Sequence, residues 1–283
     1  MQSKELVQSP RHLDEALAIL AEGRSDLKII AGGTDLMVLL NARTFHAREF
    51  LDIWRIGELR GITDQGERIR IGALTSYSAI IASPILNASV PVLVAAARTI
   101  GAVQIQNRGT LGGNLVNGSP AGDTLPVLAA FDAEIEIRSA RGSRTLAYDD
   151  FYTGYRQTVL EPDEIVTAVS LLKLRNGEQS IFYKVGTRRA QAISKVMMAS
   201  RVSLHDGSVS SIALSFGSVT PVVRRARKLE RALVGMRAGS GLTTAIEKEL
   251  ESEISPIDDI RSTAVYRMRV ARNLLDRMLS ELP

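Results

Sequence analysis

The sequence predicts an α+β fold, because strand patterns and helix patterns follow one another in mixed order along its 283 residues. Strict apolar–polar alternation over 68–71 and 133–137 indicates half-buried strands. Helical periodicity dominates the end of the chain, at 224–234, 242–253 and 261–281. The length suggests about two domains of roughly 150 residues each. The best linker is the polar stretch 174–179, so we expect domains at 1–176 and 177–283.

The first elements follow from local signals. Ser9-Pro10 precedes apolar residues at helical spacing, and Gly23 provides the stop, which predicts a capped helix between them. A strand is expected over 27–30, directly before a pair of glycines, and a helical pattern follows at 37–40. A second strand is expected over 50–53.

The middle of the chain combines hairpins with short helices. Thr75 predicts the N-cap of a helix over 76–82, and Pro91 predicts the start of another. The stretch 107–123 is glycine-rich and predicts a loop, whose last residue, Asp123, predicts the N-cap of a helix over 124–131. Hairpins are expected at 61–71, at 133–147 around the turn 141–142, and at 196–216 around 205–207.

The residue types present exclude several kinds of chemistry. The chain has no cysteine, which excludes disulfides, thiolate nucleophiles and cysteine-held iron–sulfur clusters within it. Its three histidines, His12, His46 and His205, lie far apart in sequence, so we expect neither a zinc site nor a histidine-based triad. No run approaches the roughly 18 apolar residues of a membrane span, and the first residues lack the apolar stretch of a secretory signal. We therefore expect a cytoplasmic protein without membrane contact.

Positive charge is concentrated in the second half of the chain. Residues 177–283 carry a net positive charge, whereas 1–176 are slightly negative. This charge indicates either a solvated surface or a docking face for a partner or an anionic cofactor. On a helix, the basic residues of 224–231 would form a stripe: Arg224, Arg225, Arg227, Lys228 and Arg231. Nucleic acid is not an expected partner, because aromatics are only 5% and no basic run is interleaved with them.

Two glycine segments are the most informative features. The first glycine segment, 29–36, runs from a strand into Gly32-Gly33, and the second, 107–115, contains Gly112-Gly113. Glycine permits positive φ and close backbone approach, so successive N–H groups can surround an anion. Two facing segments of this kind could hold a pyrophosphate from both sides; the alternative is a pair of ordinary tight turns. The glycine patterns of Rossmann folds and P-loops are both missing.

Longer motifs around these segments resemble a known family. Ala31-Gly32-Gly33-Thr34-Asp35-Leu36 and Thr110-Leu111-Gly112-Gly113-Asn114-Leu115, followed by 117–123, resemble the flavin-binding medium subunits of the xanthine dehydrogenase and carbon monoxide dehydrogenase family. The resemblance extends through 160–166 and 182–190 to the tail 256–261, so it covers essentially the whole chain.

The resemblance implies a fold and a cofactor. The fold would be a vanillyl-alcohol-oxidase-like (PCMH-type) FAD-binding domain of two α+β subdomains, followed by an α+β domain with a small antiparallel sheet. FAD would lie with its pyrophosphate on the two glycine segments, and no catalytic side chain is implied. The residues that would bind FAD are Ile30, Ala31, Gly32, Gly33, Thr34, Asp35, Leu36, Ile100, Thr110, Leu111, Gly112, Gly113, Asn114, Asp123, Val166 and Lys184.

Several of these positions have a second interpretation. Asp35 would repel a pyrophosphate, so its side chain is expected to point away and leave only its N–H as a donor. Asp123 resembles a carboxylate that bonds the adenosine or ribityl portion, with a helix cap as the alternative. Lys184 resembles a basic residue near the isoalloxazine, with a surface lysine as the alternative. Ile100 and Val166 resemble apolar positions beside the flavin, or belong simply to the core.

The same resemblance implies an electron relay. A large subunit would hold molybdopterin, a small subunit would hold two [2Fe–2S] clusters, and this chain would pass electrons through FAD to NAD⁺, O₂ or another acceptor. The absence of cysteine agrees with clusters that reside on another chain. The alternative is an autonomous FAD-dependent oxidase of the same superfamily. Neither glycine segment contains the histidine or cysteine that often tethers flavin in such oxidases.

Overall fold

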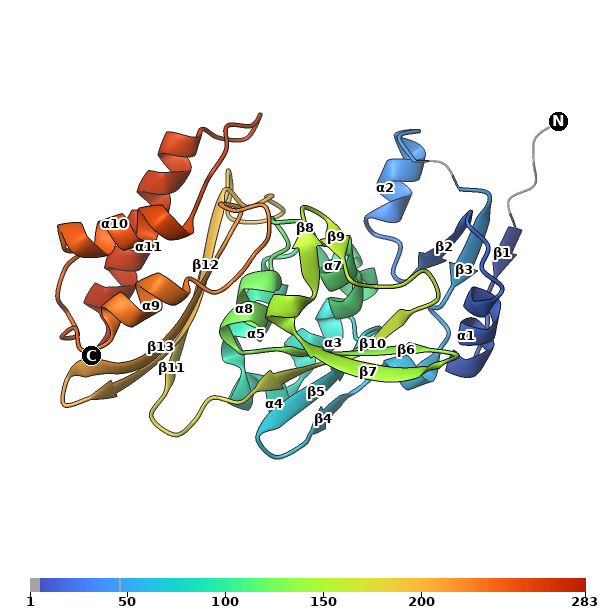
Figure 1. Ribbon diagram of the computed structural model, residues 1–283, viewed down its shortest axis with the longest axis horizontal. Coiled ribbons are helices and arrows are strands. Elements are labelled where there is room, and N and C mark those ends of the chain that lie inside the picture. The colour runs from blue at the N-terminus through green and yellow to red at the C-terminus, as the bar shows by residue number, and fades with distance from the viewer. Residues whose placement is uncertain (1–5, 46) are drawn as a thin grey trace.

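The computed structural model describes residues 6–45 and 47–283, so His46 lies outside the described residues. Three units follow one another along the long axis of the molecule (Figure 1). A small N-terminal unit occupies one end, a five-stranded sheet with helices lies in the middle, and the C-terminal sheet and helices form the other end. Both strands and helices occur in each unit, which confirms the α+β prediction.

The N-terminal unit is a parallel three-stranded sheet in the order β1-β3-β2. Its elements are β1 (Leu6–Gln8), α1 (Leu13–Ala21), β2 (Leu27–Ile30), α2 (Leu36–Asn41) and β3 (Glu49–Asp52). Helix α1 buries Leu13, Leu17 and Leu20 because these residues share one helical face. The expected cap at Ser9-Pro10 is wrong: the helix starts three residues later, and its N-cap residue makes no side-chain cap bond.

The middle unit is built on an antiparallel sheet in the order β4-β5-β10-β6-β7. Its strands are β4 (Ile62–Asp64), β5 (Arg68–Gly72), β6 (Glu134–Ser139), β7 (Gly142–Ala147) and β10 (Ile165–Leu172). The hairpins β4–β5 and β6–β7 confirm the predictions from alternation. The central strand, β10, was missed because seven of its eight residues are buried, so it shows no polar face.

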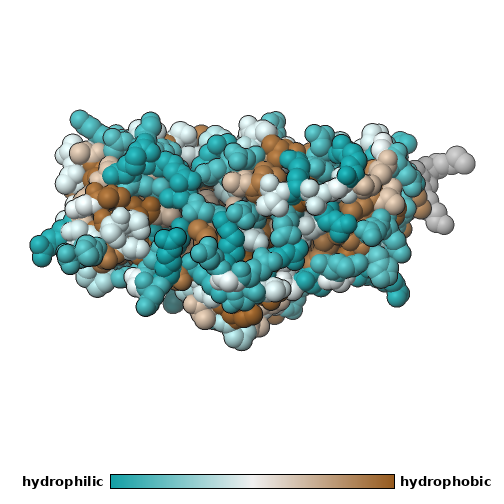
Figure 2. Space-filling model, turned by 60° about the horizontal axis from the view of Figure 1, so that its bottom comes forward, coloured by the Kyte–Doolittle hydropathy of each residue, from teal (hydrophilic) through white to brown (hydrophobic). Residues whose placement is uncertain are grey.

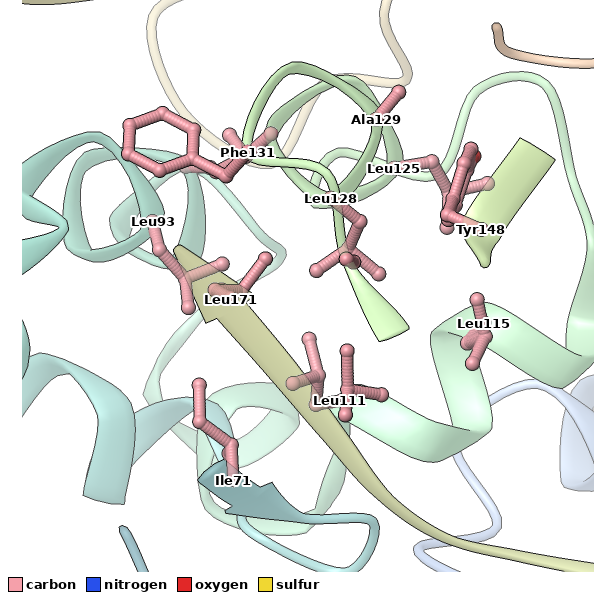
Figure 3. Packing of buried hydrophobic residues seen from close by; sticks show 14 of the residues in the cluster. Ile71, Leu93, Leu111, Leu115, Leu125, Leu128, Ala129, Phe131, Tyr148 and Leu171 are labelled. Carbon is pink, nitrogen blue, oxygen red and sulfur yellow. The ribbon is translucent and has the colours of Figure 1, made fainter. Parts of the chain in front are cut away.

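Short helices cover this sheet. They are α3 (Tyr77–Ala82), α4 (Pro84–Ser89), α5 (Pro91–Arg98), α6 (Val103–Arg108), α7 (Leu111–Asn117) and α8 (Leu125–Ala130). The shorter elements of this unit are η1 (Gly57–Leu59), η2 (Tyr148–Asp150), β8 (Tyr152–Gly154) and β9 (Gln157–Thr158). Leu111 and Leu115 of α7 face Leu128 and Tyr148 in the core (Figure 3).

Three local predictions in this region are wrong. Ser76, and not Thr75, caps α3, because the Ser76 side chain accepts from the N–H of Ala79. The stretch 107–123 is not a continuous loop, since it contains α7. Asp123 does not cap the following helix either: the N-cap residue of α8 is Thr124.

The C-terminal unit is an antiparallel sheet in the order β11-β12-β13 with helices on one face. Its elements are β11 (Gln179–Val185), β12 (Val196–His205), β13 (Ser208–Gly217), α9 (Arg227–Leu233), α10 (Thr244–Glu253) and α11 (Ala264–Glu281). The predicted hairpin and the three predicted helices are confirmed. The opposite face of the sheet packs on α5 and α8, which joins this unit to the middle one.

Only three residues of the expected basic stripe, Arg227, Lys228 and Arg231, lie on α9 and are exposed. Arg225 lies before α9 and is largely buried, where it pairs with Asp132 and Glu230. Arg224 donates to the carbonyl of Tyr152. These cations therefore stabilise the contact between the middle and C-terminal units. The face shown in Figure 2 is mainly hydrophilic, with apolar residues in small separate groups.

Candidate functional site: a cleft between two glycine segments

A cleft of about 750 Å³ is lined by both glycine segments, and this volume is typical of cofactor sites. Its walls include the end of β2, the turn 73–77, the region from α6 to α8, residues of 155–166, and residues 191–193 with Arg261. The structure brings 14 of the 16 expected FAD-binding residues to this cleft: Ile30, Ala31, Gly32, Gly33, Thr34, Asp35, Leu36, Ile100, Thr110, Gly112, Gly113, Asn114, Asp123 and Val166.

The other two expected residues do not line the cleft. Leu111 is fully buried in the hydrophobic core of the middle unit. Lys184, on β11, reaches the cleft wall only through its contact with Asp123. Conversely, sequence reasoning missed Tyr155, Arg156 and Arg261, which line the cleft although they lie far from both glycine segments in sequence.

The first glycine segment turns sharply because two of its residues require glycine. Gly33 has φ of +76°, which L-residues rarely adopt. A Cβ on Gly32 would lie 1.7 Å from the carbonyl oxygen of Arg108, so the segment lies directly against the end of α6. Among the described residues, the N–H groups of Gly32, Gly33, Thr34 and Asp35 have no protein acceptor. They are therefore available to hold an anion.

The second glycine segment is the first turn of α7. Thr110 is its N-cap, and the Thr110 hydroxyl accepts from the N–H of Gly113 at 3.0 Å. The N–H groups of Leu111 and Gly112 donate to the carbonyls of Thr75 and Ala73. The two segments are therefore not equivalent backbone cradles, because four consecutive N–H groups are free in the first, whereas those of Leu111, Gly112 and Gly113 in the second already have acceptors.

Gly112 and Gly113 instead provide close packing and a bare surface. A Cβ on Gly112 would lie 2.7 Å from the Cβ of Ala73, so glycine lets α7 approach the preceding turn. Gly113 does not have a positive φ, and a Cβ there would contact only the Thr110 hydroxyl within 4 Å. Gly113 thus leaves room at the cleft wall and does not relieve backbone strain.

The carboxylate of Asp35 is already hydrogen-bonded to the opposite wall of the cleft. It accepts a hydrogen bond from the side-chain amide of Asn117 on α7. The amide oxygen of Asn117 in turn accepts from Arg156 at 3.4 Å. This chain of contacts links the first glycine segment to α7 across the cleft and leaves the N–H of Asp35 as its free group.

Asp123 and Lys184 form a buried ion pair at the cleft wall. Lys184 Nζ donates to Asp123 Oδ2 at 2.5 Å and to the carbonyl of Thr99 at 3.0 Å, and the two side chains are 10% and 9% exposed. Lys184 is therefore not a surface lysine. Burial raises the pKa of Asp123 to about 6, against the opposing effect of Lys184. The second oxygen, Oδ1, is buried and has no hydrogen-bond partner, so the wall carries an unused acceptor.

We expect Asp123→Asn to change how the stability of the FAD-free chain depends on pH. The folded-state pKa of Asp123 lies above its ordinary value of 3.8, so the folded chain binds more protons than the unfolded chain between about pH 4 and pH 6. Ionisation therefore removes up to ~3 kcal/mol of stability as pH rises through this window, and asparagine cannot ionise. Urea unfolding at pH 4.5 and pH 7 should show that the wild type loses more free energy of unfolding between these two pH values than the variant does. Parallel pH profiles of the two chains would contradict this.

Comparison with known proteins agrees with this cleft and fold. The family described as FAD binding domain in molybdopterin dehydrogenase matches residues 2–171, and the CO dehydrogenase flavoprotein C-terminal domain matches residues 181–282. No helix within the described residues is long and apolar enough to cross a membrane. Likewise, no group of three or more potential metal-ligating side chains occurs among them.

Relatives match over nearly their whole length. The chain is 33% identical over 270 residues to the glyceraldehyde dehydrogenase medium chain of Sulfolobus acidocaldarius, covering 95% of each. It is 30% identical over 271 residues to the xanthine dehydrogenase FAD-binding subunit of Escherichia coli O157:H7, covering 95% of this chain and 92% of that one. The structure of carbon monoxide dehydrogenase from Hydrogenophaga pseudoflava superposes with a TM-score of 0.91 at 30% identity, covering 97% and 95%.

These matches, with the cleft between two glycine segments, define an FAD-binding subunit of an oxidoreductase. The chain belongs to the xanthine dehydrogenase and carbon monoxide dehydrogenase family of molybdenum hydroxylases, as one of its medium subunits. The residues present fit the cofactor: free N–H groups suit a pyrophosphate, Gly113 leaves space, and Asp123 Oδ1 can accept a hydrogen bond from a hydroxyl.

Proposed function

We propose that this subunit receives electrons from an iron–sulfur subunit and passes them through FAD to NAD⁺ or another acceptor. The family membership supports this role, since the solved structures that resemble this chain include a Cu,Mo-CO dehydrogenase, at 27% identity. Molybdopterin and the [2Fe–2S] clusters would reside on partner subunits, because this chain has no cysteine to ligate a cluster. FAD itself supplies the redox chemistry when bound.

The observation that carries this proposal is the set of free N–H groups in the first glycine segment, beside the unused acceptor of Asp123. We propose that FAD lies in this cleft and is held by the lining residues named above. Lys184 would act through Asp123, because its ammonium group contacts the carboxylate from outside the cleft. Ile100 and Val166 would provide apolar contact for the ring system.

The chain's own residues bind and orient FAD, and none is proposed to transfer a proton. Asp35 is hydrogen-bonded to Asn117, and Glu164 is paired with Arg144. Asp123 is paired with Lys184 through one oxygen, and we assign its other oxygen to a hydroxyl of FAD. This argues against the autonomous oxidase, which would need acid–base residues beside its substrate. We further propose that the chain divides into an FAD-binding domain, 1–176, and a C-terminal domain, 177–283. A cytoplasmic location stays a prediction from the sequence.

Rapid mixing of substrate with the FAD-loaded chain tests the relay. We expect purines, aldehydes and N-heterocycles to leave the flavin absorbance near roughly 450 nm unchanged when the chain is alone. The same substrates should bleach it once the molybdopterin and iron–sulfur subunits are added. Anaerobic addition of NAD⁺ to the bleached complex then tests this acceptor, because only a competent acceptor restores the absorbance. Fast bleaching of the isolated chain would instead establish an autonomous oxidase.

A further inference from the structure

The single tryptophan of the chain contacts two arginines that the proposed function does not use. Trp54 follows strand β3, and the guanidinium carbons of Arg60 and Arg108 lie over its ring, 4.2 and 3.9 Å from the centroid. Among the described residues, the hydrogen bonds of both guanidinium groups go to backbone carbonyls and not to carboxylates. The indole ring is therefore the main group that attracts Arg108 to this place.

Trp54 and Arg60 form a fixed support. Arg60 donates to the carbonyl of Leu74 at 2.9 Å and to the carbonyl of Trp54 at 2.7 Å. The N–H of Trp54 donates to the carboxylate of Asp52 at 3.0 Å. Burial, together with the nearby charge of Arg108, lowers the pKa of Arg60. The ring is thus held by the backbone around it, while Arg108 arrives from another part of the fold.

Arg108 is the junction between the two glycine segments. It is the last residue of α6 and stands two positions before Thr110, the N-cap of α7. Its carbonyl oxygen occupies the place where a side chain on Gly32 would lie, and its Nε donates to the carbonyl of Gly32 at 3.4 Å. A displacement of Arg108 would therefore change the distance between the first segment and α7.

We propose that Trp54 is a positioning residue for the FAD cleft: its ring holds the Arg108 guanidinium and so fixes the first glycine segment against the start of α7. This inference rests on the proposed location of FAD in that cleft. Trp54 itself does not line the cleft, so its effect on FAD passes through Arg108. The free N–H groups and the wall that carries Asp123 must face the same ligand, which is why their spacing affects affinity.

The test is a double-mutant cycle on FAD affinity with Trp54→Leu and Arg108→Met. Each single variant should weaken FAD binding about tenfold, and the double variant should be no weaker than either, because both remove the same contact. Trp54→Phe keeps an aromatic face and should restore most of the affinity. Arg55→Met is the matched control, since it removes a neighbouring exposed cation without touching the ring, and it should bind FAD as the wild type does.

Tryptophan fluorescence gives a second readout, because Trp54 is the only tryptophan. In the FAD-free chain, Arg108→Met should shift the Trp54 emission, whereas Arg55→Met should not. Full FAD affinity in both folded single variants, or purely additive losses, would overturn the proposal. If Trp54→Leu does not fold, the affinity and emission of Arg108→Met decide the matter. If FAD does not bind in this cleft at all, Gly32→Ala should also keep its FAD. That result would distinguish a wrong FAD site from a wrong role for Trp54.

Discussion

Gly32→Ala is expected to lower FAD affinity at least a hundredfold. The added Cβ would lie 1.7 Å from the carbonyl oxygen of Arg108 and 2.6 Å from its carbonyl carbon. Both are backbone atoms, so no side-chain rotation relieves the contact, and the first glycine segment must move away from α6 by more than an ångström. The free N–H groups then lose their alignment with the opposite wall. A hundredfold loss corresponds to ~2.7 kcal/mol, measured by titration of the FAD-free chain.

Gly57→Ala provides the matched control for this variant. Gly57 has no positive φ, and a Cβ there would meet nothing within 4 Å. It should therefore retain wild-type affinity and a wild-type circular dichroism spectrum. A folded Gly32→Ala chain that binds FAD as tightly as Gly57→Ala would remove the first glycine segment from the cofactor site.

Arg267→Met is expected to lower the free energy of unfolding by about 2–4 kcal/mol, because partly buried carbonyl groups lose their charged donor and each such unsatisfied group costs about 1–3 kcal/mol. Arg267 is only 3% exposed and donates to the carbonyls of Lys195 and Ser218 at 2.8 and 3.0 Å. It also donates to Asp259 Oδ1 at 2.7 Å. The variant leaves these acceptors without their donor and loosens the turn that carries Arg261 to the cleft. Chemical denaturation measures the loss directly.

The pH dependence of stability provides a second measurement on this variant. Burial alone would raise the pKa of Asp259, but the N–H groups of Arg261 and Ser262 and the guanidinium of Arg267 outweigh it and lower the pKa to about 2. The wild-type chain therefore binds fewer protons when folded and loses stability as pH falls from about 4 to 2. This loss should be smaller in Arg267→Met.

Arg272→Met is the control on the same helix. Its partner, Glu251, is about half exposed, and exposed pairs contribute about 0–1 kcal/mol. Equal destabilisation by Arg267→Met and Arg272→Met would contradict the special role of the buried arginine.

Local patterns predicted the elements whose two faces differ. Strand β5 alternates between partly exposed and buried residues, and the helices of the last sixty residues repeat at helical spacing, so both were visible in the sequence. Strand β10 was not, because burial on both faces removes the alternation. Helix α7 was also hidden: Gly112 and Gly113 disfavour a helix, which here is stabilised by the Thr110 cap and by contact with Ala73.

By itself, the sequence determined the α+β class, the two glycine segments, the absence of cluster ligands and, through the quoted motifs, the family. Only the tertiary structure decided how the site works. It showed that the run of four free N–H groups belongs to the first segment, because the carbonyls of Ala73 and Thr75 and the Thr110 hydroxyl accept from three consecutive N–H groups of the second. It also paired Asp123 with Lys184 across 61 positions of sequence. Such pairings arise from the packing of distant elements, and no local pattern encodes them.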